Sequence, residues 1–132
     1  MFVTEIDPSQ ARLTARASGP TTAPDINAGI LDWAATIASE PRNNVLVVDY
    51  SDADLSSIDT PDVQSIAKVT PALYEARPSL FVLLVLPGEM DYGLGRMWEA
   101  YSQLESEHAG IVRSRDDVEG YLSDHANAIS RT

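Results

Sequence analysis

The sequence predicts an α/β fold, a mixed five-stranded sheet with four helices in the order β-β-α-β-α-β-α-β-α. Short apolar runs typical of buried strands alternate with longer segments whose apolar residues recur at helical spacing. Strands that are separated by single helices pair in parallel through right-handed crossovers. Two amino-terminal runs are separated only by a turn, so they predict a hairpin that adds an antiparallel strand. Residues 1–132 are expected to form a single domain.

The predicted hairpin joins residues 2–6 to residues 11–17 through the turn Asp7-Pro8-Ser9-Gln10, where proline is favourable. Apolar and polar residues alternate in the second run, which indicates a strand with one buried and one solvent-facing side. Gly19-Pro20 is expected to end this strand. The first run would lie at the sheet edge, and an unpaired edge permits a two-fold homodimer.

The first helix is predicted to start after Thr21 or Thr22, either of which can cap it. Its buried stripe consists of apolar residues at helical spacing, namely Ile26, Ile30, Trp33, Ala34 and Ile37. Residues 40–44 then end the helix. The continuous apolar run 45–48 predicts a central strand that is covered on both faces.

The second helix is predicted to start near Thr60, whose hydroxyl is expected to cap it, with Pro61 at the first helical position. Its inward residues are Val63, Ile66, Ala67, Thr70 and either Leu73 or Tyr74. Because Pro71 lacks a backbone N–H, a kink or break is expected just before it. Residues 77–78 end this segment, and the apolar run 80–86 predicts the second central strand.

The last third of the chain predicts two further helices and one strand. A loop over residues 87–91 precedes an amphipathic helix from residue 94 to about residue 107. Residues 110–113 predict a short strand. Ser114 or Asp116 then starts the last helix, whose inward residues are Val118, Tyr121, Leu122 and His125.

The composition excludes several classes of function. The chain carries 20 acidic and 9 basic residues, so its surface repels nucleic-acid phosphates and anionic membranes. The longest apolar run, residues 80–86, is far shorter than the roughly 20 residues of a membrane-spanning helix. The amino terminus lacks the basic segment and apolar core of a signal peptide, and there are no cysteines. We therefore expect a cytoplasmic protein without disulfides or bound nucleic acid.

Enzyme motifs are missing from the sequence as well. Lys68 lies within a predicted helix rather than in a phosphate-binding loop, and Gly93-Leu94-Gly95 lacks the third glycine of a dinucleotide fingerprint. There is no Gly-x-Ser-x-Gly nucleophile turn. His108 is expected at a solvated helix end, and His125 on the inward side of the last helix. We therefore expect no catalytic residues, no cofactor and no enzymatic activity.

The segment of greatest interest is acidic and follows the first central strand. Asp49 stands at the expected strand end, and residues 50–62 add four acids and no base. In α/β proteins the carboxyl ends of buried strands are where ligands and partners usually bind. We predict a surface for a basic or neutral protein partner, formed by Asp49, Asp52, Asp54, Asp59, Thr60 and Asp62. A loose divalent-cation site and an ordinary solvated loop are the open alternatives.

Three segments resemble a known family. They are Gly19-Pro-Thr-Thr-Ala-Pro-Asp25, Val45-Leu-Val-Val-Asp49, and Gly95-Arg-Met-Trp-Glu-Ala-Tyr101 followed by Ile111-Val-Arg-Ser-Arg-Asp-Asp-Val-Glu-Gly-Tyr-Leu122. Together with the order of elements, they resemble the SpoIIAA-like branch of the STAS superfamily, which includes the anti-sigma factor antagonists. The resemblance covers nearly the whole chain. It implies a STAS-like fold and a non-enzymatic, regulatory role in binding other proteins.

The resemblance also points to a candidate regulatory residue. The family's motif is an aspartate and a phosphorylatable serine at the start of the helix after the central strand, and Asp59 and Thr60 are similar in position. Pro61 and Asp62 replace the small residues that follow in the family. A phosphate on Thr60 would meet the helix amino terminus but also two carboxylates. We therefore expect Thr60 to be a helix cap without a working phosphorylation switch.

The resemblance implies an alternative function too. The fold of SpoIIAA-like domains is similar to that of the lipid-binding CRAL-TRIO domains, which implies an apolar cavity under the helix of residues 94–104 for a lipid or another small molecule. Methionine and aromatic side chains adapt to irregular ligands, so the expected lining residues are Met90, Met97, Trp98 and Tyr101. The same stripe is also typical of an ordinary core.

Overall fold

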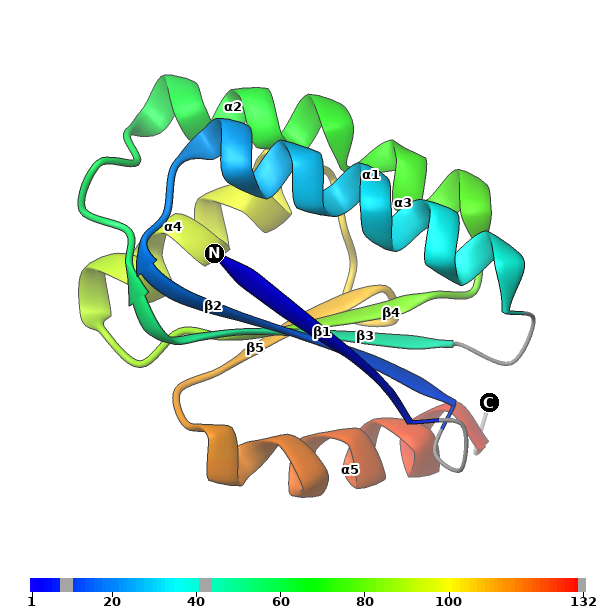
Figure 1. The fold of residues 1–132 in the computed structure, drawn as a ribbon. Coiled ribbons are helices and arrows are strands. Elements are labelled where there is room, and N and C mark those ends of the chain that lie inside the picture. The colour runs from blue at the N-terminus through cyan, green and yellow to red at the C-terminus, as the bar shows by residue number, and fades with distance from the viewer. Residues whose placement is uncertain (8–10, 41–43, 131–132) are drawn as a thin grey trace.

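The computed structural model describes residues 1–7, 11–40 and 44–130. Five strands form one sheet whose spatial order, β1-β2-β3-β4-β5, follows their order along the chain (Figure 1). They are β1 (Phe2–Asp7), β2 (Arg12–Pro20), β3 (Val45–Asp54), β4 (Phe81–Val85) and β5 (Ala109–Val112). β1 pairs antiparallel with β2, and the other neighbouring strands pair in parallel. The predicted hairpin and mixed sheet are confirmed, with β1 as an edge strand.

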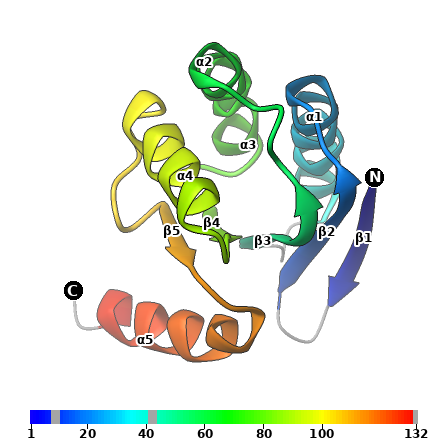
Figure 2. The same cartoon turned by 90° about the vertical axis from the view of Figure 1, so that its left-hand side faces the viewer.

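The helices cover the two faces of the sheet unequally (Figure 2). One face carries α1 (Ala23–Ser39), α2 (Thr60–Val69), α3 (Pro71–Ala76) and α4 (Glu89–Tyr101). The other face carries α5 (Val118–Ser130), which follows the short 3-10 helix η1 (Arg115–Asp117). The predicted fold class is confirmed. The second predicted helix is divided into α2 and α3 because Pro71 interrupts it, as expected.

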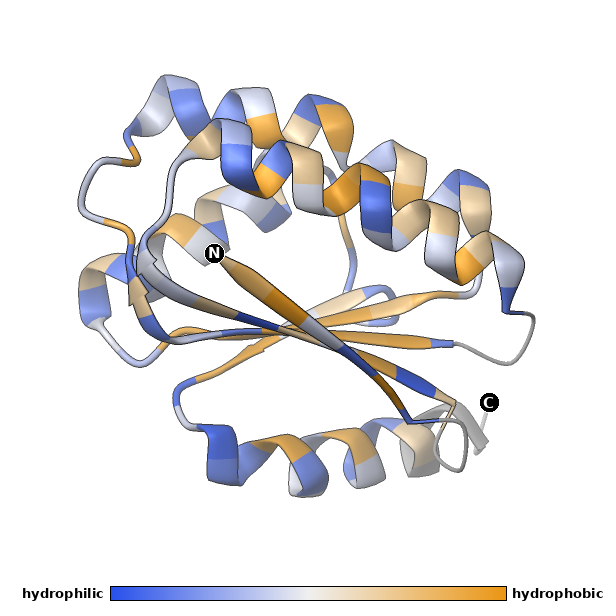
Figure 3. Ribbon diagram, in the orientation of Figure 1, coloured by the Kyte–Doolittle hydropathy of each residue, from blue (hydrophilic) through white to orange (hydrophobic). Residues whose placement is uncertain are grey.

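An apolar cluster on each face of the sheet holds the layers together. The larger cluster lies between the sheet and the helices α1 to α4, and it includes the inward stripe predicted for α1. The smaller cluster lies under α5 and consists of Val47, Phe81, Leu83, Val85, Val112 and Val118. Figure 3 shows hydrophobic residues along the central parts of β3 and β4. All of β4 is buried because helices cover it on both sides.

β2 and β3 extend well beyond the residues that the sequence predicts. Gly19 and Pro20 do not end β2, because Gly19 adopts a φ of 70° and the strand continues past a bulge. The register then pairs Ser18 with Asp52 and Pro20 with Asp54. β3 consequently runs to Asp54, so the first part of the segment expected to be an acidic loop is strand.

Helix α4 both starts and ends earlier than predicted. It starts at Glu89 after Gly88, inside the stretch expected to be a loop. It ends at Tyr101 rather than near residue 107. Gln103 has a φ of 57°, which a right-handed helix cannot contain, and this residue marks the end of the helical path.

Two predicted connections fall partly on residues outside the described ranges. They are the hairpin turn, at residues 8–10, and the end of the first helix, at residues 41–43. None of the helices in the described part of the chain is long and apolar enough to cross a membrane.

Two glycines of α4 provide a matched test of its packing. A β-carbon at Gly95 would lie 2.5 Å from Leu86 Cδ1 and 2.9 Å from Ile111 Cδ1, whereas one at Gly93 would meet nothing within 4 Å. We expect Gly95→Ala to lower the free energy of unfolding by about 1–3 kcal/mol through overpacking. Gly93→Ala should raise it by up to about 1 kcal/mol through helix propensity. Urea unfolding of both variants checks this, and equal stabilities would contradict the close packing of α4.

Candidate functional site

Two aspartates fix the start of α2. The Asp59 carboxylate accepts a hydrogen bond from the Asp62 backbone N–H at 3.0 Å, and the Asp62 carboxylate accepts one from the Asp59 N–H at 3.1 Å. This reciprocal capping box satisfies two backbone donors. The predicted capping role of Thr60 is wrong, because Asp59 is the cap and Thr60 is the first, exposed residue of the helix.

The end of β3 carries two exposed acids. Asp54 accepts a hydrogen bond from the Ser56 backbone N–H at 2.9 Å, and hydrogen bonds from Ser56 hold the pKa of Asp54 below its ordinary value. The Asp52 carboxylate accepts a hydrogen bond from Arg115 Nη2 at 3.1 Å while its side chain stays 69% exposed. Both carboxylates are therefore accessible to a partner.

Asp49 differs from these acids because its side chain is buried. It accepts hydrogen bonds from Arg115 Nε and from the backbone N–H and hydroxyl of Ser51, and its side chain is 3% exposed. Burial alone would raise the pKa of Asp49, but the hydrogen bonds from Ser51 and Arg115 outweigh burial and hold the pKa below its ordinary value. Asp49 therefore anchors η1 to β3, and it adds no exposed acid to the predicted surface.

Arg115 also argues against the alternative prediction, a divalent-cation site in the acidic segment. Its guanidinium contacts Asp49 and Asp52, two of the acids that such a site would need. Arg115 thus already binds one oxygen of each carboxylate through a charge-assisted hydrogen bond, which disfavours a cation between them. In residues 1–7, 11–40 and 44–130, no group of three or more histidine, aspartate or glutamate side chains is arranged to hold a metal ion.

An accessible acidic surface remains, which consists of Asp52, Asp54, Asp59, Thr60 and Asp62. Its first two residues lie at the end of β3, and the other three lie at or next to the start of α2. Figure 1 shows these two ends on the same side of the molecule, joined by a short loop. The structure therefore keeps most of the predicted surface together, without Asp49.

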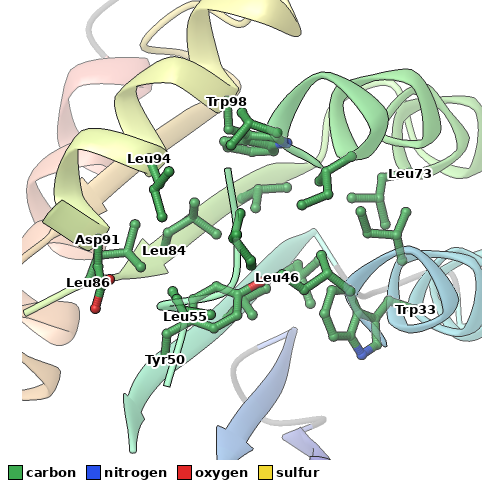
Figure 4. Close-up of a pocket in the computed structure, with 18 residues that line it drawn as sticks. Trp33, Leu46, Tyr50, Leu55, Leu73, Leu84, Leu86, Asp91, Leu94 and Trp98 are labelled. Carbon is green, nitrogen blue, oxygen red and sulfur yellow. The ribbon is translucent and has the colours of Figure 1, made fainter. Parts of the chain in front are cut away.

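An apolar cavity of about 60 Å³ lies between the sheet and the helices α1, α2 and α4 (Figure 4). Its walls include both tryptophans, Trp33 and Trp98, and Tyr50 of β3. Burial raises the pKa of the Tyr50 hydroxyl well above its ordinary value. Asp91, at the start of α4, is the one acid among the described residues that line the cavity.

Of the four residues expected to line a cavity under α4, Trp98 does so. Its indole Nε1 also donates a hydrogen bond to Thr70 Oγ1 at 2.8 Å. Met90 is 86% exposed and Tyr101 is 46% exposed, and neither lines the cavity. Met90 and Met97 instead line an outer groove of about 420 Å³ beside it.

The spacing along α4 explains why the prediction missed some of these residues. Positions 91, 94, 95 and 98 form the inward stripe, and positions 90, 97 and 101 all lie to one side of it. Sequence reasoning assigned the stripe to the large apolar residues and so overlooked Asp91. It also overlooked Arg115. This residue is 66 positions away from Asp49 in the sequence, and no local pattern predicts a contact over that separation.

Comparison with known proteins identifies the class of fold. No family model matches the chain, and no curated protein matches it in sequence. Among solved structures, the anti-sigma factor antagonist SpoIIAA in its unphosphorylated form is similar, with a TM-score of 0.60. The match covers 94% of this chain and 98% of that chain at 9% sequence identity. The chain therefore has the SpoIIAA-like fold, a STAS fold, that its sequence predicts.

The capping box at the start of α2 can be tested with two neighbouring substitutions. Asp59→Ala removes the cap and should lower the free energy of unfolding by about 1 kcal/mol. Thr60→Ala removes a side chain that does not cap the helix and should change stability by less than about 0.5 kcal/mol. Thermal or urea unfolding distinguishes the two. If Thr60→Ala lowered the free energy of unfolding more than Asp59→Ala does, Thr60 would be the cap after all.

Asp49 should make stability depend on pH in a defined direction. The pKa of Asp49 is lowered in the folded state, so the ionised carboxylate stabilises the fold. This contribution to the free energy of unfolding is fully present above the ordinary carboxyl pKa of about 4, and it is lost as the pH falls through the lowered pKa. We expect Asp49→Asn to lower the free energy of unfolding by about 1–3 kcal/mol at neutral pH. Urea unfolding should show this difference shrinking below about pH 4.

The exposed Asp124 of α5 supplies the control for this measurement, as Asp124→Asn. The free energy of unfolding of the Asp124→Asn variant should equal that of the parent protein at each pH. A deficit of Asp49→Asn that stayed constant between pH 7 and pH 3 would contradict the role of the buried carboxylate.

Proposed function

We propose that this chain is a non-enzymatic, cytoplasmic regulatory domain whose acidic surface binds a protein partner with a basic face. The observation that carries the proposal is the grouping of four accessible carboxylates, those of Asp52, Asp54, Asp59 and Asp62, at neighbouring ends of β3 and α2. The fold adds support, because it is similar to that of an anti-sigma factor antagonist.

The capping box prepares two of these carboxylates for binding. Asp59 uses Oδ1 and Asp62 uses Oδ2 to accept the capping hydrogen bonds, and a carboxylate has further acceptor sites. Both side chains are therefore held in place before a partner arrives, which reduces the entropy lost on binding. Arginine is a suitable counterpart, since its planar guanidinium binds a carboxylate through two parallel hydrogen bonds.

The net charge of the protein favours basic partners. With a net charge of −11, the protein attracts basic partners over a distance of about the Debye length, ~8 Å at physiological ionic strength. Charges at the rim of an interface act mainly on the association rate and on the choice of partner. The proposed binding should consequently weaken as salt is added.

The proposed regulation does not use phosphorylation of Thr60. The carboxylates of Asp59 and Asp62 already accept hydrogen bonds from backbone donors at the start of α2. A phosphate on Thr60 would compete for this helix terminus and would lie next to two negative charges. The surface is therefore proposed to bind its partner constitutively.

A second candidate function is the binding of a small apolar molecule. The observation that favours it is the cavity between the sheet and α4, whose walls are apolar and include both tryptophans. Well-packed interiors contain few voids larger than a water molecule, so a cavity of this size is a natural place for a ligand.

Partner binding can be tested by removing charge while keeping the caps. Asparagine is also a good helix cap, so the triple variant Asp54→Asn, Asp59→Asn, Asp62→Asn should unfold within about 1 kcal/mol of the parent. We expect its capture of protein partners to fall at least tenfold, because each lost charge weakens the interaction with a basic surface. Affinity capture with quantitative mass spectrometry measures this.

The matched control is the triple variant Glu75→Gln, Glu105→Gln, Glu107→Gln, which removes the same charge from exposed positions outside the surface. It should retain the partners of the parent protein. Equal retention by both triple variants would mean that another part of the molecule binds the partner.

A further inference from the structure

The apolar cavity and the outer groove adjoin, because they share part of their lining. Four residues line both of them, namely Leu55, Ile58, Asp91 and Leu94. The groove extends outward along Met90 and Met97 on α4 and along Ala53 and Asp54 at the end of β3. A molecule lying in the groove would pass these shared residues to place one end in the cavity.

The cavity and the groove differ in the charged groups that they carry. Leucine, isoleucine, valine and aromatic side chains form nearly the whole wall of the cavity, and Figure 4 shows Asp91 at its margin beside Leu86. Within the described part of the chain, the Asp91 carboxylate has no hydrogen-bonding or ionic partner. Asp54 adds a second exposed carboxylate to the groove. An apolar interior thus adjoins, at one unpaired acid, a largely apolar groove that carries a second carboxylate.

The size of the cavity limits what can enter it. About 60 Å³ is roughly four to six times the ~10–15 Å³ that one water molecule needs, and it is less than half of a ~150 Å³ cavity that accepts benzene. A chain of a few carbon atoms fits this space, whereas an acyl chain of a membrane lipid does not. The groove, at about 420 Å³, is large enough for the rest of a small molecule.

We propose that the cavity and the groove together form a binding site for a short cationic amphiphile, such as an alkyl amine. Its apolar end occupies the cavity, and its ammonium group lies at Asp91, within the field of Asp54. Charge complementarity selects this ligand class, because a carboxylate at the mouth of an apolar site favours a cation and disfavours an anion. The proposal rests on the second candidate function and specifies its ligand.

Four probes test the proposal on the purified full chain. They are hexylammonium, hexan-1-ol, hexanoate and ethylammonium, and binding is followed by calorimetry and by the fluorescence of the two tryptophans in the cavity wall. We expect hexylammonium to bind about tenfold more tightly than hexan-1-ol, as one charge-assisted hydrogen bond implies. Hexanoate should bind most weakly of the six-carbon probes. Ethylammonium, which carries the charge without the tail, should leave the fluorescence unchanged.

Two variants locate the site. Asp91→Asn should reduce the affinity for hexylammonium to that for hexan-1-ol, whereas Asp124→Asn, a neutralised exposed acid on α5, should bind like the parent. Ile58→Trp places a large side chain where cavity and groove meet and should abolish the fluorescence response to both six-carbon probes. Circular dichroism confirms that each variant is folded.

Two results would overturn the proposal. One is equal binding of hexylammonium and hexan-1-ol to the parent protein, and the other is hexylammonium binding that survives both Asp91→Asn and Ile58→Trp. Binding of hexan-1-ol without any preference for the amine would still support a small apolar ligand in the cavity. Because no protein partner is present in these measurements, their failure leaves the partner-binding function untouched.

Discussion

The parallel pairing of β2 with β3 determines where the other parts of the candidate site lie. The ladder continues past a bulge, where Ala17 of β2 lies opposite two residues of β3, and β3 stays extended as far as Asp54. Along an extended strand, consecutive side chains point to opposite faces of the sheet. Asp49 therefore reaches η1 on one face, while Tyr50 enters the cavity on the other.

Three ion pairs attach η1 and α5 to the sheet. Arg115 contacts Asp49 and Asp52 on β3, and Arg12 on β2 contacts Glu119 at the start of α5. A small apolar cluster also packs under α5, and it contains fewer buried residues than the cluster on the other face of the sheet. Among these links only that of Asp49 joins a buried carboxylate, and removing Arg115 would leave this charge without its ionic partner.

The sequence predicted the fold because its patterns are local. Alternation in the second strand, helical spacing around Trp33 and the proline at position 71 each specify structure within a few neighbouring residues. The acidic segment was interpreted less well, because its conformation depends on Ser18 to Pro20, which lie far away in sequence and pair with it. Likewise, the ion pair of Asp49 and the junction at Asp91 arise from tertiary packing. Such contacts cannot be predicted from composition or periodicity.

The sequential order of the five strands has a consequence for folding. Each strand pairs with a strand next to it in the chain, so the sheet can grow from one end without any distant segment being inserted between two strands. Each parallel pair still closes a loop that contains at least one helix, and parallel sheets form slowly for this reason. Helix α5 makes a contact of much greater sequence separation, because Glu119 pairs with Arg12, 107 positions away. The layer under the sheet is therefore expected to assemble last, after the sheet that receives it has formed.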